Sequence, residues 1–184
     1  MSKVRQVVLD MLKVRKYKIP ESEVDINGFM EAEEYLTHKI YDESEKIYIF
    51  FPTMPKVGVT TIRQYIQEME ENNVPQSIIV VKETITAFAK QVFVEAKPLI
   101  IDYFKESELQ MNILNHVLVP KHEILSDEQK EELLKMYKCK EVQLQKMLSS
   151  DPVARFFGAR RGQVFKITRT SETSGSYENY RVVV

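Results

Sequence analysis

Residues 149–175 read SSDPVARFFGARRGQVFKITRTSETSG, the most position-specific run in the chain. Asp151 followed by Pro152 predicts a helix start, because an aspartate side chain accepts from unpaired N–H groups and proline is tolerated at the first helical position. Gly158 predicts the end of this short helix, since glycine readily adopts the left-handed conformation common there. The alternation from Gln163 to Thr168 then predicts a half-buried strand.

The turn between this helix and this strand, residues 159–162, holds two adjacent arginines and ends in Gly162, which allows the chain to reverse. Guanidinium groups pair well with carboxylates. The segment can therefore present positive charge to an acidic partner, although solvated surface charge is the alternative. Its basic residues are Arg155, Arg160, Arg161, Lys166 and Arg169.

Around this segment, residues 114–184 predict a small two-layer α+β domain with the element order β-α-β-α-β-β. Ser126, with Gln129 three residues later, forms the capping-box pattern of a helix start. We expect the inner face of that helix to hold Leu133, Leu134, Met136 and Tyr137. The predicted strands are 117–119, 144–148, 163–168 and 177–184.

Residues 1–113 predict an α/β layer. The continuous apolar run at Ser77–Val81 predicts a strand that is covered on both faces. In a predicted helix at 86–96, we expect Phe88, Val92 and Ala96 to point inward. The other predicted elements are helices at 2–16 and 60–72, a short helical turn from Pro20, a hairpin of strands 35–41 and 47–51, and strands 99–104 and 109–114.

Composition excludes several classes of protein. The 184 residues are 43% hydrophobic, which suffices for a packed core. No apolar run approaches the roughly eighteen residues of a membrane helix, no secretory signal is expected, and a single cysteine fits a reducing compartment. The net charge of −1 combines basic ends with an acidic middle over 19–113. Proteins that bind nucleic acid alone usually have a large basic excess, so we expect any DNA contact to be local or made within a larger assembly.

Candidate metal ligands and catalytic residues do not form a recognised pattern. His116, His122 and Cys139 lack the spacing of a zinc site. Glu95-x-Lys97 matches part of a magnesium nuclease motif, but it precedes Pro98 at a predicted helix end, and no companion acid accompanies it. The sequence therefore predicts no cofactor, no metal and no catalysis, with a magnesium-dependent endonuclease as the alternative.

Motifs in both halves of the chain match one protein family. The C-terminal matches are Leu118-Val119-Pro120-x-His122, Asp151-Pro152-Val153-Ala154-Arg155, Gly158, Arg161-Gly162-Gln163-Val164 and Arg169-x-Ser171-Glu172-Thr173. The N-terminal matches are Phe50-Phe51-Pro52, Pro55-Lys56-Val57-Gly58, Ile79-Val80-Val81 and Ala89-Lys90-Gln91. On these residues the chain resembles the fifth subunit shared by the nuclear DNA-directed RNA polymerases, a family that also has a counterpart in the archaeal polymerase. The resemblance covers most of the chain.

This resemblance implies a non-catalytic polymerase subunit with two domains. Residues 1–113 would be an abbreviated jaw of truncated restriction-endonuclease-like fold beside downstream duplex DNA. Residues 114–184 would be an assembly domain that docks on the largest subunit and contacts other subunits. The implied location is the nucleus, or a viral factory or the cytoplasm for a viral source, with no membrane partner. A free transcription regulator with the same domain is a further alternative.

The resemblance also implies individual site residues. In the jaw loop, Thr86 and Lys90 are the candidates for facing DNA, although Ala87 and Phe88 replace the proline and serine of the family pattern. In the assembly domain, Thr170 stands at a proline position of the family. The turn glycines are Gly158 and Gly162. The candidates for docking the partner are Val119, Pro120, His122, Asp151, Arg155, Arg160, Arg161, Gln163, Arg169, Ser171 and Glu172.

Overall fold

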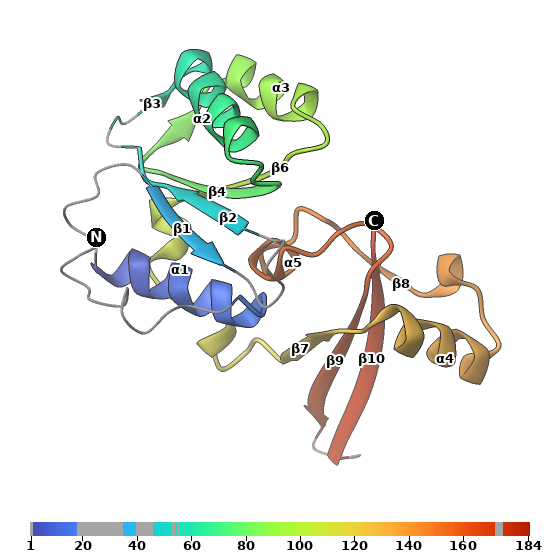
Figure 1. The fold of residues 1–184 in the computed structure, drawn as a ribbon. Coiled ribbons are helices and arrows are strands. Elements are labelled where there is room, and N and C mark those ends of the chain that lie inside the picture. The colour runs from blue at the N-terminus through green and yellow to red at the C-terminus, as the bar shows by residue number, and fades with distance from the viewer. Residues whose placement is uncertain (1, 18–34, 40–45, 53, 55, 172–174) are drawn as a thin grey trace. The chain divides into compact units, whose positions relative to one another are not determined.

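The structure is a computed structural model, and it describes all residues except 1, 18–34, 40–45, 53, 55 and 172–174. The chain divides into two compact units, Met1–Met111 and Asn112–Val184 (Figure 1). Each unit has its own sheet and its own buried core. The predicted helical turn from Pro20 and the predicted hairpin turn at 42–45 lie outside the described residues.

The first unit is built on a four-stranded sheet in the order β1-β2-β4-β6. The strands are β1 (Tyr35–Lys39), β2 (Lys46–Phe50), β4 (Gln76–Val81) and β6 (Ile100–Lys105). β1 and β2 form the predicted antiparallel hairpin, and the remaining pairs are parallel. Strand β4 lies inside the sheet and is buried along almost its whole length, which confirms the covered strand predicted from its apolar run.

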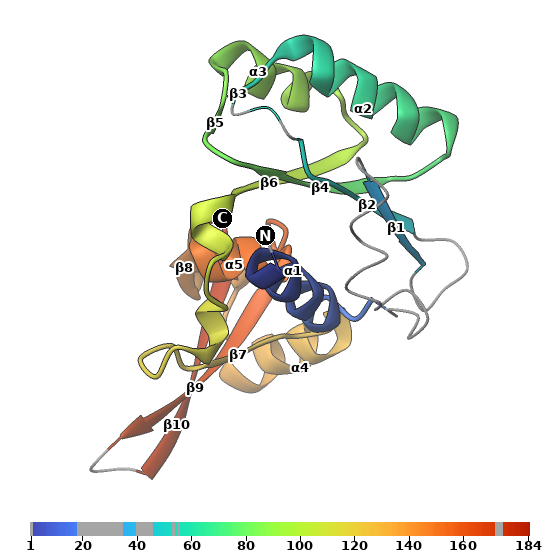
Figure 2. The same ribbon diagram turned by 90° about the vertical axis from the view of Figure 1, so that its left-hand side faces the viewer.

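Helices cover both faces of this sheet. Figure 2 shows α2 (Val59–Glu71) and α3 (Ala87–Glu95) on one face and α1 (Ser2–Val14) on the other. β3 (Lys56–Val57) and β5 (Thr84–Ile85) pair in a short parallel sheet. In the sequence, β3 comes just before α2 and β5 just before α3. The core under α2 and α3 includes Phe50, Val57, Ile62, Met69, Ile79, Ala89 and Val92.

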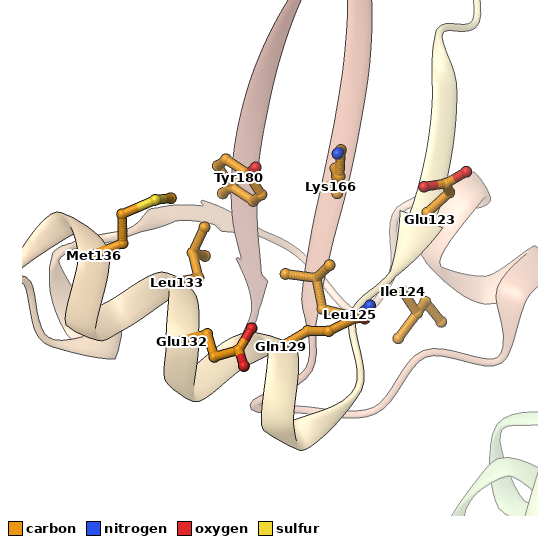
Figure 3. A pocket seen from close by; sticks show the side chains of 9 residues that line it. All are labelled: Glu123, Ile124, Leu125, Gln129, Glu132, Leu133, Met136, Lys166 and Tyr180. Carbon is orange, nitrogen blue, oxygen red and sulfur yellow. The ribbon is translucent and has the colours of Figure 1, made fainter.

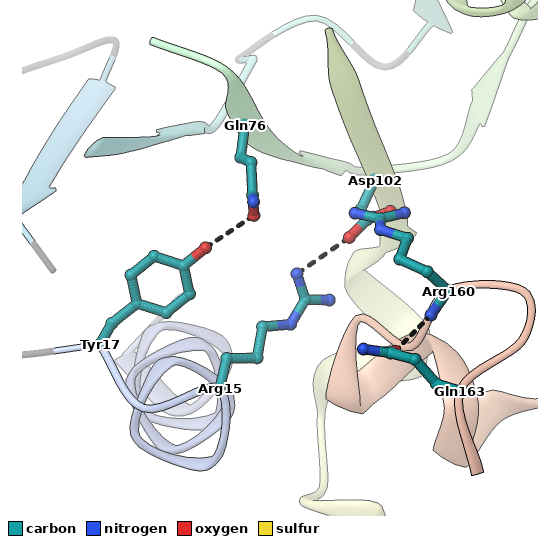
Figure 4. A network of polar contacts seen from close by, with 6 residues as sticks. All are labelled: Arg15, Tyr17, Gln76, Asp102, Arg160 and Gln163. Atoms are coloured by element: carbon teal, nitrogen blue, oxygen red, sulfur yellow. Dashed lines mark hydrogen bonds and ion pairs between the residues drawn. The ribbon is translucent and has the colours of Figure 1, made fainter. Parts of the chain in front are cut away.

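Two polar contacts tie the end of α1 and the residues after it to the sheet (Figure 4). The Arg15 guanidinium lies 2.9 Å from the Asp102 carboxylate, and the Arg15 side chain is only 5% exposed. The Tyr17 hydroxyl donates to Gln76 Oε1 at 2.7 Å. These contacts fix α1 against β6 and β4, because charge-assisted bonds are strong and directional.

Two predictions for residues 86–114 are wrong. Residues 109–114 do not form a strand but run from the end of one 3₁₀ turn, η3 (Glu106–Leu109), into the next, η4 (Ile113–Asn115). The Asn112 side chain accepts from Leu114 N at 3.0 Å, a local bond that competes with extended structure. Phe88 does not point inward: it is 73% exposed, whereas Ala89 and Val92 are buried. The helix starts at its Thr86 cap, and the three-residue spacing from there turns Ala89 and Val92 toward the sheet.

The second unit contains a four-stranded sheet in the order β7-β9-β10-β8. Its elements follow one another as β7 (Lys121–Ile124), α4 (Asp127–Tyr137), η5 (Glu141–Gln143), β8 (Gln145–Met147), α5 (Pro152–Phe157), β9 (Val164–Ser171) and β10 (Gly175–Val183). Neighbouring strands are antiparallel except β8, which runs parallel to β10. The long β9–β10 hairpin extends beyond the residues that pair with β7 and β8 (Figure 1).

The two helices of this unit cover opposite faces of its sheet, whereas the sequence predicted two layers. Leu133 of α4 packs with Val164 and Val182. Val153 and Ala154 of α5 pack with Phe165. Because adjacent residues of a strand point to opposite faces, Val164 and Phe165 place α4 and α5 on different sides of the sheet.

Two further predictions for the second unit are wrong. Residues 117–119 form a turn, in which Leu118 N donates to His116 Nδ1 at 3.2 Å, and Val117 is 96% exposed; the strand begins only after Pro120. On α4, Leu133 is buried as predicted, but Met136 is 68% exposed and Tyr137 is also exposed. In the last turn of α4, Tyr137 contacts only the ring of Tyr180 among the described aromatic residues.

Candidate functional site

Helix α5 forms as the sequence predicted. The Asp151 carboxylate accepts from Val153 N at 2.9 Å, with Pro152 at the first helical position. At the other end Gly158 has a φ of 66°, and its N–H reaches the carbonyls of Ala154 and Arg155. The helix is therefore bounded on both sides by local bonds, and Asp151 acts as its cap.

The turn after α5 is held at both ends and exposes two arginines. Arg160 N donates to Gln163 Oε1 at 2.7 Å, a bond that closes the turn (Figure 4). Gly162, with a φ of +87°, donates to Val183 O at 2.9 Å and accepts from Lys130 Nζ at 2.7 Å. Arg160 and Arg161 are both exposed on this fixed frame, whereas the Gln163 side chain is used inside it.

Phe165 links the two sides of this region. Its ring is fully buried and makes edge contacts with the rings of Phe157, at a centroid distance of 5.4 Å, and His122, at 5.9 Å. Val119 packs against the same core from the turn before β7. The predicted docking residues on α5, β7 and β9 therefore share one buried support.

The face of the sheet beside α5 carries Arg169, which is a predicted docking residue, and Arg181, which the sequence analysis did not single out. The register pairs His122 with Ile167, Arg181 with Phe165 and Arg169 with Tyr177, so these side chains share that face. The Nε atoms of Arg169 and Arg181 are buried and have no hydrogen-bond partner within the described part of the chain. Arg181 stands on the face of β10 that faces α5, and the alternation in residues 177–184 was the signal that could have placed it there.

His122 lies half-buried on this face. Its Nδ1 donates to the Pro120 carbonyl at 2.6 Å, a local contact across the start of β7. Burial lowers the pKa of His122 below its usual value; the Pro120 carbonyl and Asp151 oppose this, and Arg169 and Arg181 add to it. The fold therefore favours the neutral imidazole.

The remaining candidates lie elsewhere or outside the described residues. In the first unit, Thr86 caps α3, its hydroxyl accepting from Ala89 N at 3.4 Å, and Lys90 Nζ lies 5.4 Å from the centre of the Tyr103 ring. Ser171 is half-buried at the end of β9, and Glu172 is not described. Arg155 is half-buried on α5.

The described residues contain no group of three or more histidine, cysteine, aspartate or glutamate side chains arranged to hold a metal ion. Cys139 is half-buried with a free thiol. Glu95 ends α3, and both it and Lys97 are exposed. Among the helices that the structure describes, none is both long and apolar enough to cross a membrane.

Replacing Gly158 by valine should destabilise the second unit. A β-branched residue is strained at a φ of 66°, and we expect a loss of about 1–3 kcal/mol in the free energy of unfolding. Urea unfolding of the full chain, followed by the amide signals of β9, measures this loss. Gly58→Val is the control, because an added Cβ meets no atom within 4 Å there and the glycine has an extended φ of −92°. Equal stability of Gly158→Val and the wild type would contradict the assigned left-handed cap.

His122 should make the second unit sensitive to acid. Because its pKa in the fold lies below the usual 6.5, the unfolded chain binds the proton more readily, and stability falls as the pH drops below about 6.5. His122→Gln should reduce this loss, measured as the urea midpoint across the range from about pH 7 to pH 5. A profile unchanged by His122→Gln would show that other groups cause the acid sensitivity.

These observations first define a class: a two-unit α/β protein whose second unit presents arginines on a rigid helix–turn–strand frame. The family model for the RNA polymerase Rpb5 C-terminal domain matches residues 111–183, and the model for the Rpb5 N-terminal domain matches residues 1–69. The chain belongs to the RNA polymerase Rpb5 family.

Relatives match over nearly the whole chain. A Dictyostelium discoideum protein named "DNA-directed RNA polymerases I, II, and III subunit rpabc1" is 45% identical over 98% of this chain and 95% of its own length. Proteins named "DNA-directed RNA polymerases I, II, and III subunit RPABC1" from Caenorhabditis briggsae and Caenorhabditis elegans are 40% and 39% identical, each over 99% of this chain and 94% of its own length. The identification from motifs is confirmed.

Proposed function

We propose that this chain is a non-catalytic subunit of DNA-directed RNA polymerase. The observation that carries the proposal is similarity along almost the full length to relatives named as subunits shared by polymerases I, II and III. Its contribution to transcription is structural. The two units provide binding surfaces for other polymerase subunits and for DNA, and nucleotidyl transfer belongs to other subunits. The location that follows from this role is the nucleus.

The second unit docks on the largest polymerase subunit through the surface formed by α5, the turn after it and β9, which we call the arginine surface. Four features support this assignment: exposed Arg160 and Arg161, the buried unpaired Nε atoms of Arg169 and Arg181, the local bonds that fix the turn, and the buried Phe165 beneath it. Guanidinium groups held in a fixed geometry bind carboxylates of a partner with little loss of conformational freedom.

The first unit, with a fold of the truncated restriction-endonuclease type, acts as a jaw beside downstream duplex DNA. Thr86 and Lys90 lie on the exposed start of α3, where the Lys90 ammonium, 5.4 Å from the centre of the Tyr103 ring, can reach a phosphate. Their contribution is local, since residues 19–113 are acidic overall. DNA is therefore held by the assembled enzyme and guided by this unit.

Co-purification tests this function most directly. An affinity-tagged full-length chain, expressed in its own source cells, should co-elute with the large polymerase subunits in constant proportion, and the eluate should synthesise RNA from a DNA template. A chain that elutes free of polymerase subunits would instead favour a separate transcription regulator. Magnesium-dependent DNA cleavage by the purified chain, lost in Glu95→Ala, would favour an endonuclease.

A further inference from the structure

A groove of about 290 Å³ lies between α4 and the face of the sheet that α4 covers (Figure 3). Small-molecule sites usually have volumes of about 300–1,000 Å³, so this groove lies at the small end of that range. It therefore suits one or two side chains of a protein partner better than a cofactor. We call it the α4 groove. The residues that matter for its chemistry are Leu125, Gln129, Glu132, Leu133, Met136 and Tyr180.

The floor of the α4 groove is apolar and its mouth is uncovered. Leu133 is buried with Val164 and Val182, and Leu125 and Tyr180 pack partly exposed against them. Met136 lies on the same wall as Leu133 and remains 68% exposed (Figure 3). Methionine is flexible and polarisable, so it can close over an inserted apolar side chain.

The helical wall of the groove is fixed before any ligand arrives. Ser126 and Gln129 form a complete capping box at the start of α4. Lys130 Nζ donates to the Gly162 carbonyl at 2.7 Å and lies 2.8 Å from the Glu141 carboxylate, which anchors the helix to the rest of the unit. A preformed wall lowers the entropy cost of binding a short segment.

The charge at the rim is negative. Lys166 is paired with Glu178 at 2.6 Å, so this cation is already neutralised. Glu123 is likewise paired with Lys121 at 2.6 Å. Glu132 is exposed and makes no ion pair with any described residue. The uncompensated charge attracts a cation and disfavours phosphates, and this argues against a nucleic acid or a nucleotide as the occupant.

We propose that the α4 groove binds a short segment of a partner protein in which a large apolar side chain is followed by lysine or arginine. The apolar side chain enters between Leu133 and Tyr180 under Met136, and the cation pairs with Glu132. This site lies on the opposite face of the sheet from α5, so it does not overlap the arginine surface. The proposal stands without the polymerase assignment, because it depends only on the second unit.

A random peptide library displayed on phage, selected on the full chain, tests the proposal. We expect enriched peptides to share an apolar residue followed within one helical turn by Lys or Arg. A synthetic peptide with the enriched sequence should bind about tenfold more weakly to Met136→Asp, because apolar anchors at groove centres carry much of the affinity. Glu132→Lys should weaken the same peptide by reversing the charge at the rim.

Two matched variants separate the groove from the surface around it. Val142→Asp places the same charge at an exposed apolar residue outside the groove lining, and Glu131→Lys reverses the neighbouring helix charge. Both should keep wild-type affinity for the peptide. The proposal is overturned if enriched peptides are acidic, if they bind all four variants equally, or if Met136→Asp dissociates a dimer of the chain and so identifies a second copy as the occupant.

Discussion

Phe165→Ala should destabilise the second unit by about 3–5 kcal/mol, the usual cost of emptying a buried phenylalanine site. Phe165 is fully buried, and its ring supports Phe157 on α5 and His122 on β7. A small domain is stable by only about 5–15 kcal/mol, so this loss leaves little protection. The arginine surface should lose its support together with the core.

Hydrogen exchange measured by mass spectrometry on the full chain resolves this effect by unit. Amides of β9 and β10 should lose most of their protection in Phe165→Ala, while amides of β4 in the first unit keep theirs. Val117→Ala is the matched control, because that apolar side chain is 96% exposed. If β4 loses protection together with β9, the two units unfold as one and are not independent.

The parts of the site that the sequence predicted depend on residues close together in the chain. The cap by Asp151, the left-handed Gly158 and the capping box of Ser126 with Gln129 each involve partners within a few residues. Backbone geometry alone decides whether such contacts can form, so their residue types can be recognised without the fold. This is why α4 and α5 begin where expected.

Strands were mispredicted where an apolar run had no neighbour to pair with. Residues 109–114 and 117–119 contain the residue types of strands, but the structure places them in turns held by local bonds from Asn112 and His116. A strand gains stability from a partner that is distant in sequence, and β-propensity does not report whether that partner exists. The strand that does form, β7, reads KHEI and lies opposite β9.

Side-chain direction was the other limit. Phe88 and Met136 are large and apolar, yet both are exposed, because the position of each helix against its sheet is set by other side chains. The sequence did not identify Arg181, because only its register with Phe165 shows which face of the sheet its side chain lies on. Gln163 Oε1 closes the turn at residues 159–162, and a part for Gln163 in docking stays a prediction.

Reversing the charge of both exposed arginines, in the double variant Arg160→Glu/Arg161→Glu, should separate docking from folding. The turn persists because it is closed by the backbone N–H of Arg160 and by Gly162, so the thermal midpoint of the free chain should change little. Each lost charge-assisted hydrogen bond costs about 1.5–3 kcal/mol, and like charges then repel. Two such losses total about 3–6 kcal/mol and predict binding to the largest polymerase subunit that is weaker by at least about a hundredfold.

Quantitative pull-down with that subunit, beside thermal melts of the free protein, measures both effects. The control is Lys138→Glu/Lys140→Glu, which reverses two exposed charges in a turn of the same unit with matching geometry, since Lys140 N donates to Gln143 Oε1 at 2.7 Å. It should retain wild-type docking, because it lies outside the arginine surface. Wild-type docking by the arginine variant would place the docking surface elsewhere on the unit. If both variants weaken docking equally, the effect comes from overall charge and not from specific contacts made by Arg160 and Arg161.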